Sequence, residues 1–384
     1  MDRVYIFDTT LRDGDQTPGV NLKLEQKIEI AKELEKARVD VIEAGFAASS
    51  SGEFENVKTI ASIVKESTVA TLCRTVSKDI DIGWEAVKNA ANPRIHVFIS
   101  TSDVHLQTMM KKSRDEVLEI TENMVKYAKK YCSDIEFSAQ DATRSDWDFL
   151  IKVLQIAVKS GATTINIPDT VGYTIPEEYS SLIKTILEKV DGKYIISTHC
   201  HDDLGLAVAN SLAAVKAGAR QVEGCINGIG ERAGNTALEE VIMAIKIRKD
   251  FFNLWTNIDT TRIYTLSQMV SMYSGIPIQP NKAIVGLNAF RHQSGVHQHG
   301  VVSNRMNYEI IDPQDIGLPK GGIIVLNKNS GRHGLKAKLN ELGFQLTEDE
   351  INKVFEKFKR IADSKGEIKD EELVDIVKEE IKNF

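Results

Sequence analysis

Eight short apolar segments recur between Val4 and Cys225, and each is followed by polar residues and then by a helical pattern. Their spacing of roughly 25–40 residues is what repeated strand–helix units require. Amphipathic stretches such as Leu24–Ala37 and Glu116–Tyr131 lie between them. The expected strands are Val4–Phe7, Val39–Glu43, Val69–Leu72, Arg94–Ile99, Ile135–Ser138, Thr164–Ile167, Tyr194–Ser197 and Gln221–Cys225.

Eight such units predict an α/β fold, a (β/α)8 TIM barrel. An open, doubly wound parallel sheet is the alternative. Candidate ligands follow both the first and the seventh expected strand, and barrel closure would bring those distant strand ends to one rim. A closed barrel therefore fits the pattern better.

The pattern changes after about residue 275. Residues 276–332 are rich in Gly, Asn and Pro, and helical periodicity returns from Thr347, which reads as an N-cap before an acidic first turn. Asp370–Ile381 is expected to form a last short helix. We expect a catalytic barrel over residues 1–275 and a linker with a mostly helical accessory segment over 276–384.

Composition narrows the class of protein. The net charge is −7 and no basic block occurs, which disfavours a nucleic-acid partner. No apolar run reaches the roughly 20 residues that span a bilayer. A strand is expected from Val4 onward, leaving no room for a signal peptide, and the four cysteines form no CxxC pair. We expect a cytoplasmic enzyme with reduced thiols and no membrane partner.

The segment His199-Cys200-His201 ends the seventh expected strand. Residues two apart on a strand point to the same side, so both imidazoles would face one point. Asp13, after the first strand, supplies a carboxylate. Two histidines and an aspartate suit a divalent ion such as Mg²⁺, Mn²⁺ or Zn²⁺. Simple packing of the two histidines at a strand end is the other interpretation.

Further polar residues follow the same strand ends. Arg12 could bind a substrate carboxylate or stabilise an oxyanion, or pair with Asp8 or Asp15. The glycine-rich segment after the eighth strand ends in Asn235, which could add an oxygen ligand or lie in a loop without contact to a ligand. The other candidates at this rim are His105, Ser138, Gln140, Asn166 and Thr170.

His297 and Tyr308 lie outside the expected barrel. A histidine near its ordinary pKa is a suitable general base, and a tyrosine can share the proton. A second metal site and ordinary loop residues are the alternatives for this histidine-rich segment.

Together, Leu11–Gly14, His199–Gly205 and Asn227–Asn235 resemble the motifs of the DRE-TIM metallolyase superfamily. Within it the chain resembles the acyl-CoA-condensing branch, which includes the 2-isopropylmalate, homocitrate and citramalate synthases. Ile167–Tyr173 looks most like the first of these. The similarity covers roughly residues 3–335.

The resemblance implies that Asp13, His199 and His201 bind the metal, with Asn235 at or next to it. Arg12 would polarise the keto oxygen of the substrate. His297 and Tyr308 would come from the partner subunit of a homodimer and assist proton removal. His105, Ser138, Asn166 and Thr170 would line the pocket for the 2-oxo acid.

The chain also departs from that pattern. Gln140 stands where family members usually carry a glutamate of the proton chemistry, and Asp15 replaces another glutamate. Gln293, His299 and Asn329 replace the usual Glu, Asp and His. Residues 346–384 are too short for a full leucine-sensing domain.

The expected activity is a metal-dependent condensation of acetyl-CoA with a 2-oxo acid, foremost 3-methyl-2-oxobutanoate, giving 2-isopropylmalate and CoA. Citramalate or homocitrate synthesis is the alternative within this class. A metal-dependent lyase or aldolase, and a paralogue weakened by Gln140, are the alternatives outside it.

Overall fold

The computed structural model describes residues 1–318 and 323–381. Within it the chain divides into two compact units, Met1–Ile278 and Gln279–Phe384. Each unit has a hydrophobic core of its own.

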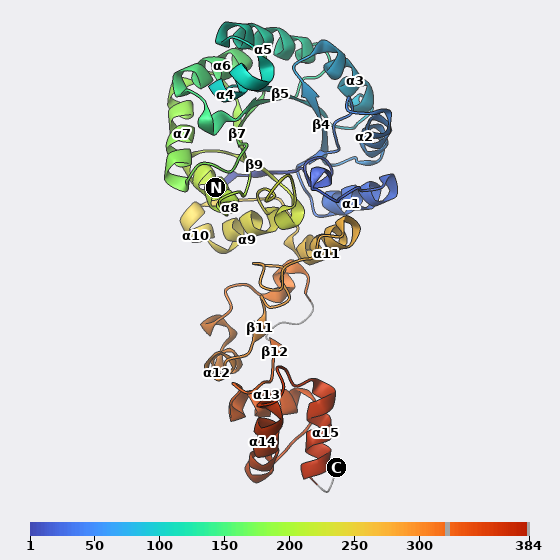
Figure 1. Ribbon diagram of the computed structural model, residues 1–384, viewed down its shortest axis with the longest axis vertical. Helices are drawn as coiled ribbons and strands as arrows, with labels where there is room; N and C mark the ends of the chain where they lie inside the picture. The colour runs from blue at the N-terminus through green and yellow to red at the C-terminus, as the bar shows by residue number, and fades with distance from the viewer. Residues whose placement is uncertain (319–322, 382–384) are drawn as a thin grey trace. The chain divides into compact units, whose positions relative to one another are not determined.

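The first unit is a closed barrel of eight parallel strands (Figure 1). Closure joins the first and last strands of the barrel, with Tyr5 opposite Gln221 and Asp8 opposite Gly224. All eight expected strands are confirmed, and the open doubly wound sheet is wrong. The strands are β2 (Tyr5–Asp8), β3 (Val41–Glu43), β4 (Thr68–Arg74), β5 (Pro93–Ser100), β6 (Ile135–Gln140), β7 (Thr164–Asp169), β8 (Ile195–Cys200) and β9 (Gln221–Gly224).

Helices form a ring around the barrel in Figure 1. The outward-facing side chains of the strands, such as Ile95, Val97 and Ile99 of β5, are buried in the main hydrophobic core. The ring consists of α1 (Leu24–Lys36), α2 (Ser51–Ile63), α3 (Ser77–Val87), α5 (Arg114–Lys129), α6 (Trp147–Ser160), α7 (Pro176–Lys189), α8 (Ala207–Ala217) and α9 (Leu238–Ile247).

The inside of the barrel is partly apolar and partly charged. Phe7, Val41 and Ala70 form a small buried apolar cluster. Elsewhere Arg94 Nη1 donates to Glu136 Oε2 at 2.8 Å and to Gln221 Oε1 at 2.9 Å. A buried charge is tolerated only when it is paired and hydrogen-bonded, so these contacts fix the interior side chains in place.

The first unit also contains shorter elements outside the barrel strands and the main helices. β1 (Asp2–Arg3) pairs in parallel with β10 (Leu254–Trp255), a small sheet that the sequence pattern did not reveal. The others are η1 (Gly14–Gln16), α4 (Asp103–His105), η2 (Leu106–Met110), η3 (Ala142–Arg144), η4 (Ile226–Gly228), α10 (Lys249–Phe252), η5 (Thr260–Arg262) and α11 (Ile263–Ser274).

The second unit is mainly helical. As expected, Thr347 caps a helix, accepting the Glu350 amide while the Glu350 carboxylate accepts the Thr347 amide. Its elements are β11 (Arg291–His292), α12 (Gly295–Ser303), η6 (Arg305–Asn307), η7 (Pro313–Ile316), β12 (Ile323–Ile324), α13 (Arg332–Glu341), α14 (Glu348–Ala362) and α15 (Asp370–Glu380).

Phe358 is fully buried in the core that α13, α14 and α15 share. Replacing it with alanine is expected to lower the free energy of unfolding of the second unit by about 3–5 kcal/mol, because the substitution leaves a cavity. Urea unfolding followed by amide exchange in α14 measures this. Replacing the partly buried Phe355 with alanine should lower the free energy of unfolding by less than half as much. Equal losses in the two variants would contradict the central place of Phe358 in this core.

No helix in the described part of the chain is both long and apolar enough to cross a membrane. The cysteines Cys73, Cys132, Cys200 and Cys225 are buried free thiols, as the missing CxxC pair led us to expect.

Candidate metal centre

Asp13 lies in the tight turn that follows β2. The amides of Arg12, Asp13 and Gly14 all donate to the Thr9 carbonyl, at 3.1, 2.8 and 3.1 Å. Thr9 is itself anchored, because its amide donates to the Gly224 carbonyl at 2.8 Å. The turn thus holds the buried Asp13 carboxylate beside the ends of the closing strands.

The two histidines meet Asp13 from β8. Their Nε2 atoms lie 3.3 Å apart. The distance to Asp13 Oδ2 is 3.2 Å from Nε2 of His199 and 3.6 Å from Nε2 of His201. His201 Nδ1 lies 3.1 Å from the Gly234 carbonyl, and His199 Nδ1 lies 3.5 Å from Glu223 Oε2. Those acceptors favour a proton on Nδ1, which leaves both Nε2 atoms facing one point.

Asn235 contacts this cluster. Its Nδ2 donates to Asp13 Oδ2 at 3.0 Å, while its Oδ1 is buried without a hydrogen-bond partner. A buried amide oxygen without a partner is costly, and a cation would satisfy it. One carboxylate, two imidazoles and an amide oxygen are donors that fit a divalent ion.

Gly234 lets the last rim loop reach the cluster. Its φ is +87°, and a Cβ there would lie 2.0 Å from the Gly228 carbonyl oxygen. Only glycine fits such a turn. Since the Gly234 carbonyl also faces His201 Nδ1, the turn that needs glycine orients the imidazole as well.

The charges of the cluster are strongly coupled. Burial raises the pKa of Asp13, but Arg12 and His199 outweigh burial and hold that pKa well below its usual range. Burial lowers the pKa of His199, but Asp13 and Glu223 raise it overall to about 9. Burial and the charge of His199 lower the pKa of His201 to about 4. Near neutral pH, His199 therefore holds a proton that a metal ion must displace.

Metal binding is accordingly expected to depend on pH. Because an imidazole must be neutral to ligate, the apparent affinity should rise about tenfold per pH unit up to about pH 9 and then level off. Calorimetric titration with Mn²⁺ in buffers of different ionisation enthalpy should show one proton released per ion. An affinity that is flat below pH 9 would contradict the arrangement.

Arg12 pairs with neither Asp8 nor Asp15. Its Nε donates to Glu43 Oε2 at 2.6 Å, and its Nη1 lies 3.6 Å from Asp13 Oδ2. The guanidinium therefore lies beside the metal cluster, fixed on one edge, and it lines the adjoining pocket.

This pocket has a volume of 240 Å³ and opens beside the two histidines. The neighbouring segments around Phe46, Leu72 and Phe98 give it an apolar wall, because the Leu72 amide donates to the Gly45 carbonyl and β4 pairs with β5. Pro168 of β7 is a further apolar lining residue. The other lining residues are Arg12, Gln16, His96, Ser138, Gln140, Asn166, Thr170, His199, His201 and Glu223.

The structure brings most of the predicted rim residues together. Ser138, Gln140, Asn166 and Thr170 all line the pocket, as do Arg12, His199 and His201. His105 lies next to it, with Nδ1 3.2 Å from Ser100 Oγ, which in turn donates to Gln140 Oε1 at 2.5 Å. The roles of these side chains remain predictions.

His297 and Tyr308 belong to the second unit. Their rings stack, with centroids 4.1 Å apart and planes inclined by 22°. His297 is exposed and Tyr308 is 42% exposed. A shared role in proton transfer fits this contact, and their approach to a metal centre remains a prediction.

The ionisable side chains inside the barrel were not predicted from the sequence. Glu43, His96 and Glu223 are buried and contact Arg12, Ser138 and His199, respectively. The sequence feature that could have revealed them is a charged or ionisable residue at an inward-facing position of an otherwise apolar strand. Of the two carboxylates that follow His201, Asp203 pairs with Arg232, and Asp202 accepts the Ala207 amide.

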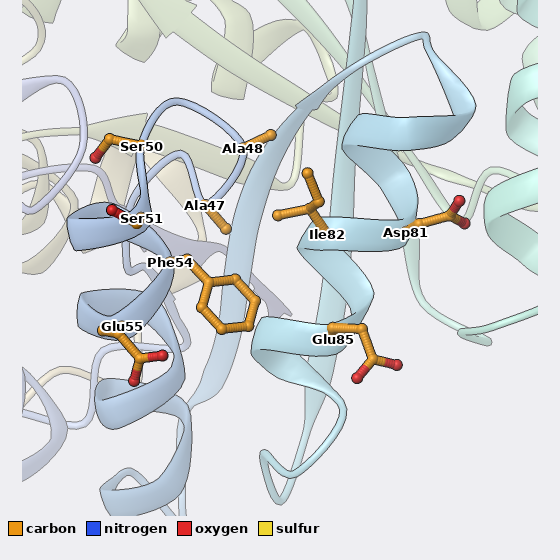
Figure 2. A pocket seen from close by; sticks show the side chains of 9 residues that line it. All are labelled: Ala47, Ala48, Ser50, Ser51, Phe54, Glu55, Asp81, Ile82 and Glu85. Carbon is orange, nitrogen blue, oxygen red and sulfur yellow. The ribbon is translucent and has the colours of Figure 1, made fainter.

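A larger hollow of 630 Å³ lies between α2 and α3, lined by Phe54, Ile82 and three acids among others (Figure 2). The acids have local partners: Asp81 accepts hydrogen bonds from Tyr127 and Tyr131, Glu85 pairs with Lys88, and Glu55 lies 3.9 Å from Lys58. The hollow is therefore an apolar groove apart from the metal cluster.

Two family models match the chain. The HMGL-like family matches residues 3–270, and the homocitrate synthase post-HMGL domain-like family matches residues 284–366.

Several curated relatives are similar along the whole chain. The 2-isopropylmalate synthase of Pelotomaculum thermopropionicum is 56% identical over 99% of this chain and 75% of its own length. That of Dictyoglomus turgidum is 54% identical over 100% of this chain and 76% of its own. The 2-isopropylmalate synthase 1 of Caldanaerobacter subterraneus is 55% identical over 100% of this chain and 97% of its own.

Solved structures share the barrel at low sequence identity. The HMG-CoA lyase of Pseudomonas aeruginosa superposes with a TM-score of 0.63 at 20% identity, covering 72% of this chain and 95% of that one. The lyase of Brucella melitensis gives 0.61 at 18% identity, covering 72% and 100%. At such identity the likeness shows the fold alone.

Proposed function

The chain belongs to the HMGL-like family, among relatives of the 2-isopropylmalate synthases, and we propose that it condenses acetyl-CoA with 3-methyl-2-oxobutanoate to give 2-isopropylmalate and CoA. The relatives' activity supports the reaction class. The pocket supports the choice of 2-oxo acid.

The observation that carries this proposal is the apolar wall beside the metal cluster. Phe46, Leu72 and Phe98 line the same 240 Å³ pocket as His199 and His201. A 2-oxo acid held at the cluster by its keto and carboxylate oxygens would turn its alkyl group to this wall. Each buried CH₂ group contributes about 0.8 kcal/mol, which favours the branched acid over pyruvate.

The charges of the pocket lining disfavour 2-oxoglutarate as the substrate. Among the described residues that line the pocket, Arg12 is the one permanent cation. Arg144 is not among these lining residues, and it donates two hydrogen bonds to Asp141 at 2.8 and 2.7 Å. A second substrate carboxylate would be buried without a partner of its own, which is costly.

Each group of side chains would have its own role in the condensation. Asp13, His199, His201 and Asn235 would hold Mg²⁺, Mn²⁺ or Zn²⁺, and a bound ion would polarise the keto group. Arg12 would stabilise the negative charge that develops on the keto oxygen. His297 of the partner subunit in a cytoplasmic homodimer, with Tyr308 of the partner subunit, would remove the proton from the acetyl methyl group.

The test is CoA release, measured with a thiol reagent in the presence of divalent metal and a panel of 2-oxo acids. The highest kcat/KM is expected with 3-methyl-2-oxobutanoate, and a chelator should abolish it. A preference for pyruvate or 2-oxoglutarate would replace the proposed substrate within the class. No CoA release with any acid, or cleavage of 2-isopropylmalate as the favoured direction, would overturn the proposal.

A further inference from the structure

Three side chains from three strands form a hydrogen-bonded chain inside the barrel. Glu43 ends β3, His96 lies in β5 and Ser138 lies in β6. Glu43 Oε1 lies 2.8 Å from His96 Nδ1, and His96 Nε2 lies 2.6 Å from Ser138 Oγ. All three are buried, with Ser138 the most exposed at 5%.

The donors and acceptors along this chain have one consistent direction. Burial raises the pKa of Glu43, but Arg12, whose Nε donates to Glu43 Oε2 at 2.6 Å, lowers it overall, so the carboxylate is ionised and accepts the Nδ1–H of a neutral His96. His96 Nε2 is then the acceptor for the Ser138 hydroxyl proton. Asn166 Nδ2 donates to Ser138 Oγ at 2.8 Å, which orients the oxygen further.

A serine, a histidine and a carboxylate in this order are the arrangement that activates a hydroxyl as a nucleophile. Ser138 and His96 both line the pocket, so a small acyl group that enters it can reach them. Arg12 lines the same pocket and carries the positive charge that an oxyanion needs. We propose that Glu43, His96 and Ser138 give the protein a second activity, the metal-independent hydrolysis of small acyl esters and thioesters through an acyl-serine.

In the first step Ser138 Oγ bonds to the acyl carbon and its proton passes to His96 Nε2. The bond from the acyl carbon to the alcohol or thiol then breaks, and the leaving group takes the proton from His96. In the second step water attacks the acyl-serine and gives one proton to His96. That proton returns to Ser138 Oγ as the carboxylic acid leaves.

A second serine–histidine contact in the same unit provides a matched control. Ser100 Oγ lies 3.2 Å from His105 Nδ1, but Ser100 donates its proton to Gln140 Oε1. This hydroxyl is therefore not activated by its histidine. Replacing Ser100 with alanine removes a buried serine of the same unit and leaves Glu43, His96 and Ser138 in place.

The experiment treats the full chain, stripped of metal by a chelator, with p-nitrophenyl acetate. The proposal predicts a burst of one p-nitrophenolate per chain and an acetyl group on Ser138 in the peptide map. Ser138→Ala and His96→Gln should each lower the rate by about 10²-fold, whereas Ser100→Ala should leave it within about twofold.

The acetyl group on Ser138 is sought in the wild-type protein, so a variant that fails to fold does not obscure that result. Absence of acetyl from Ser138 would overturn the proposal, and so would acetylation that a folded His96→Gln variant retains in full. Because no metal or 2-oxo acid is present, failure here leaves the proposed condensation untouched, and failure of the condensation leaves this test unchanged.

Discussion

Asp13→Asn is expected to abolish divalent-metal binding and to lower the rate of CoA release by about 10³-fold or more, because a bound ion supplies several kcal/mol of transition-state stabilisation. Asparagine keeps the shape of the side chain and removes its charge. The carboxylate lies within 3.2 and 3.6 Å of the two Nε2 atoms, and the three residues are the group that could hold an ion within the described chain. Calorimetry with Mn²⁺ and the CoA assay measure the two effects.

Asp15→Asn is the matched control. Asp15 lies two residues further along the same turn, but it pairs with Lys27 at 2.8 Å and is outside the metal cluster. Metal affinity should stay within a few-fold of wild type in this variant. Equal loss of metal binding in both variants would show that the turn, and not the Asp13 carboxylate, is what matters.

Gln140→Glu is expected to raise the turnover of condensation by about 10²-fold, because a positioned proton-transfer group contributes 10²–10⁴-fold in typical enzymes. Gln140 lines the pocket, and its Oε1 accepts a hydrogen bond from Ser100 Oγ. A carboxylate can accept the same bond, so the fold should tolerate the change. The natural amide cannot take up a proton as a carboxylate can.

Gln16→Glu adds the same charge at another glutamine of the pocket and should bring no such gain. Steady-state kcat with 3-methyl-2-oxobutanoate compares the two variants. A fall in turnover for Gln140→Glu would show that the amide belongs to a different proton path. An equal rise of kcat in both variants would show that any added negative charge in the pocket has this effect, whatever its position.

The barrel could be predicted because its signal is local. Each strand is a short apolar run, and its length and polar ending are visible in a single segment, as in Thr164–Asp169. The convergence of Asp13 with His199 followed from the fold class, because parallel strands of a barrel end at one rim. The HxH spacing then fixed which side chains share a face.

The partners inside the barrel could not be predicted in this way. Which residues of different strands meet depends on the tilt and stagger of the closed sheet, and no local pattern encodes them. The sequence offered Asp8 and Asp15 as the only ion-pair partners weighed for Arg12, which instead meets Glu43, 31 residues away. The contact between His96 and Ser138 spans 42 residues.

The metal centre is tested most directly with a crystal of the protein soaked in Mn²⁺ and measured at an energy where manganese scatters anomalously. We expect one strong peak at the barrel rim, about 2.0–2.2 Å from a carboxylate oxygen of Asp13 and from Nε2 of His199 and His201. A peak elsewhere, or these three side chains turned away from one another with no peak between them, would contradict it.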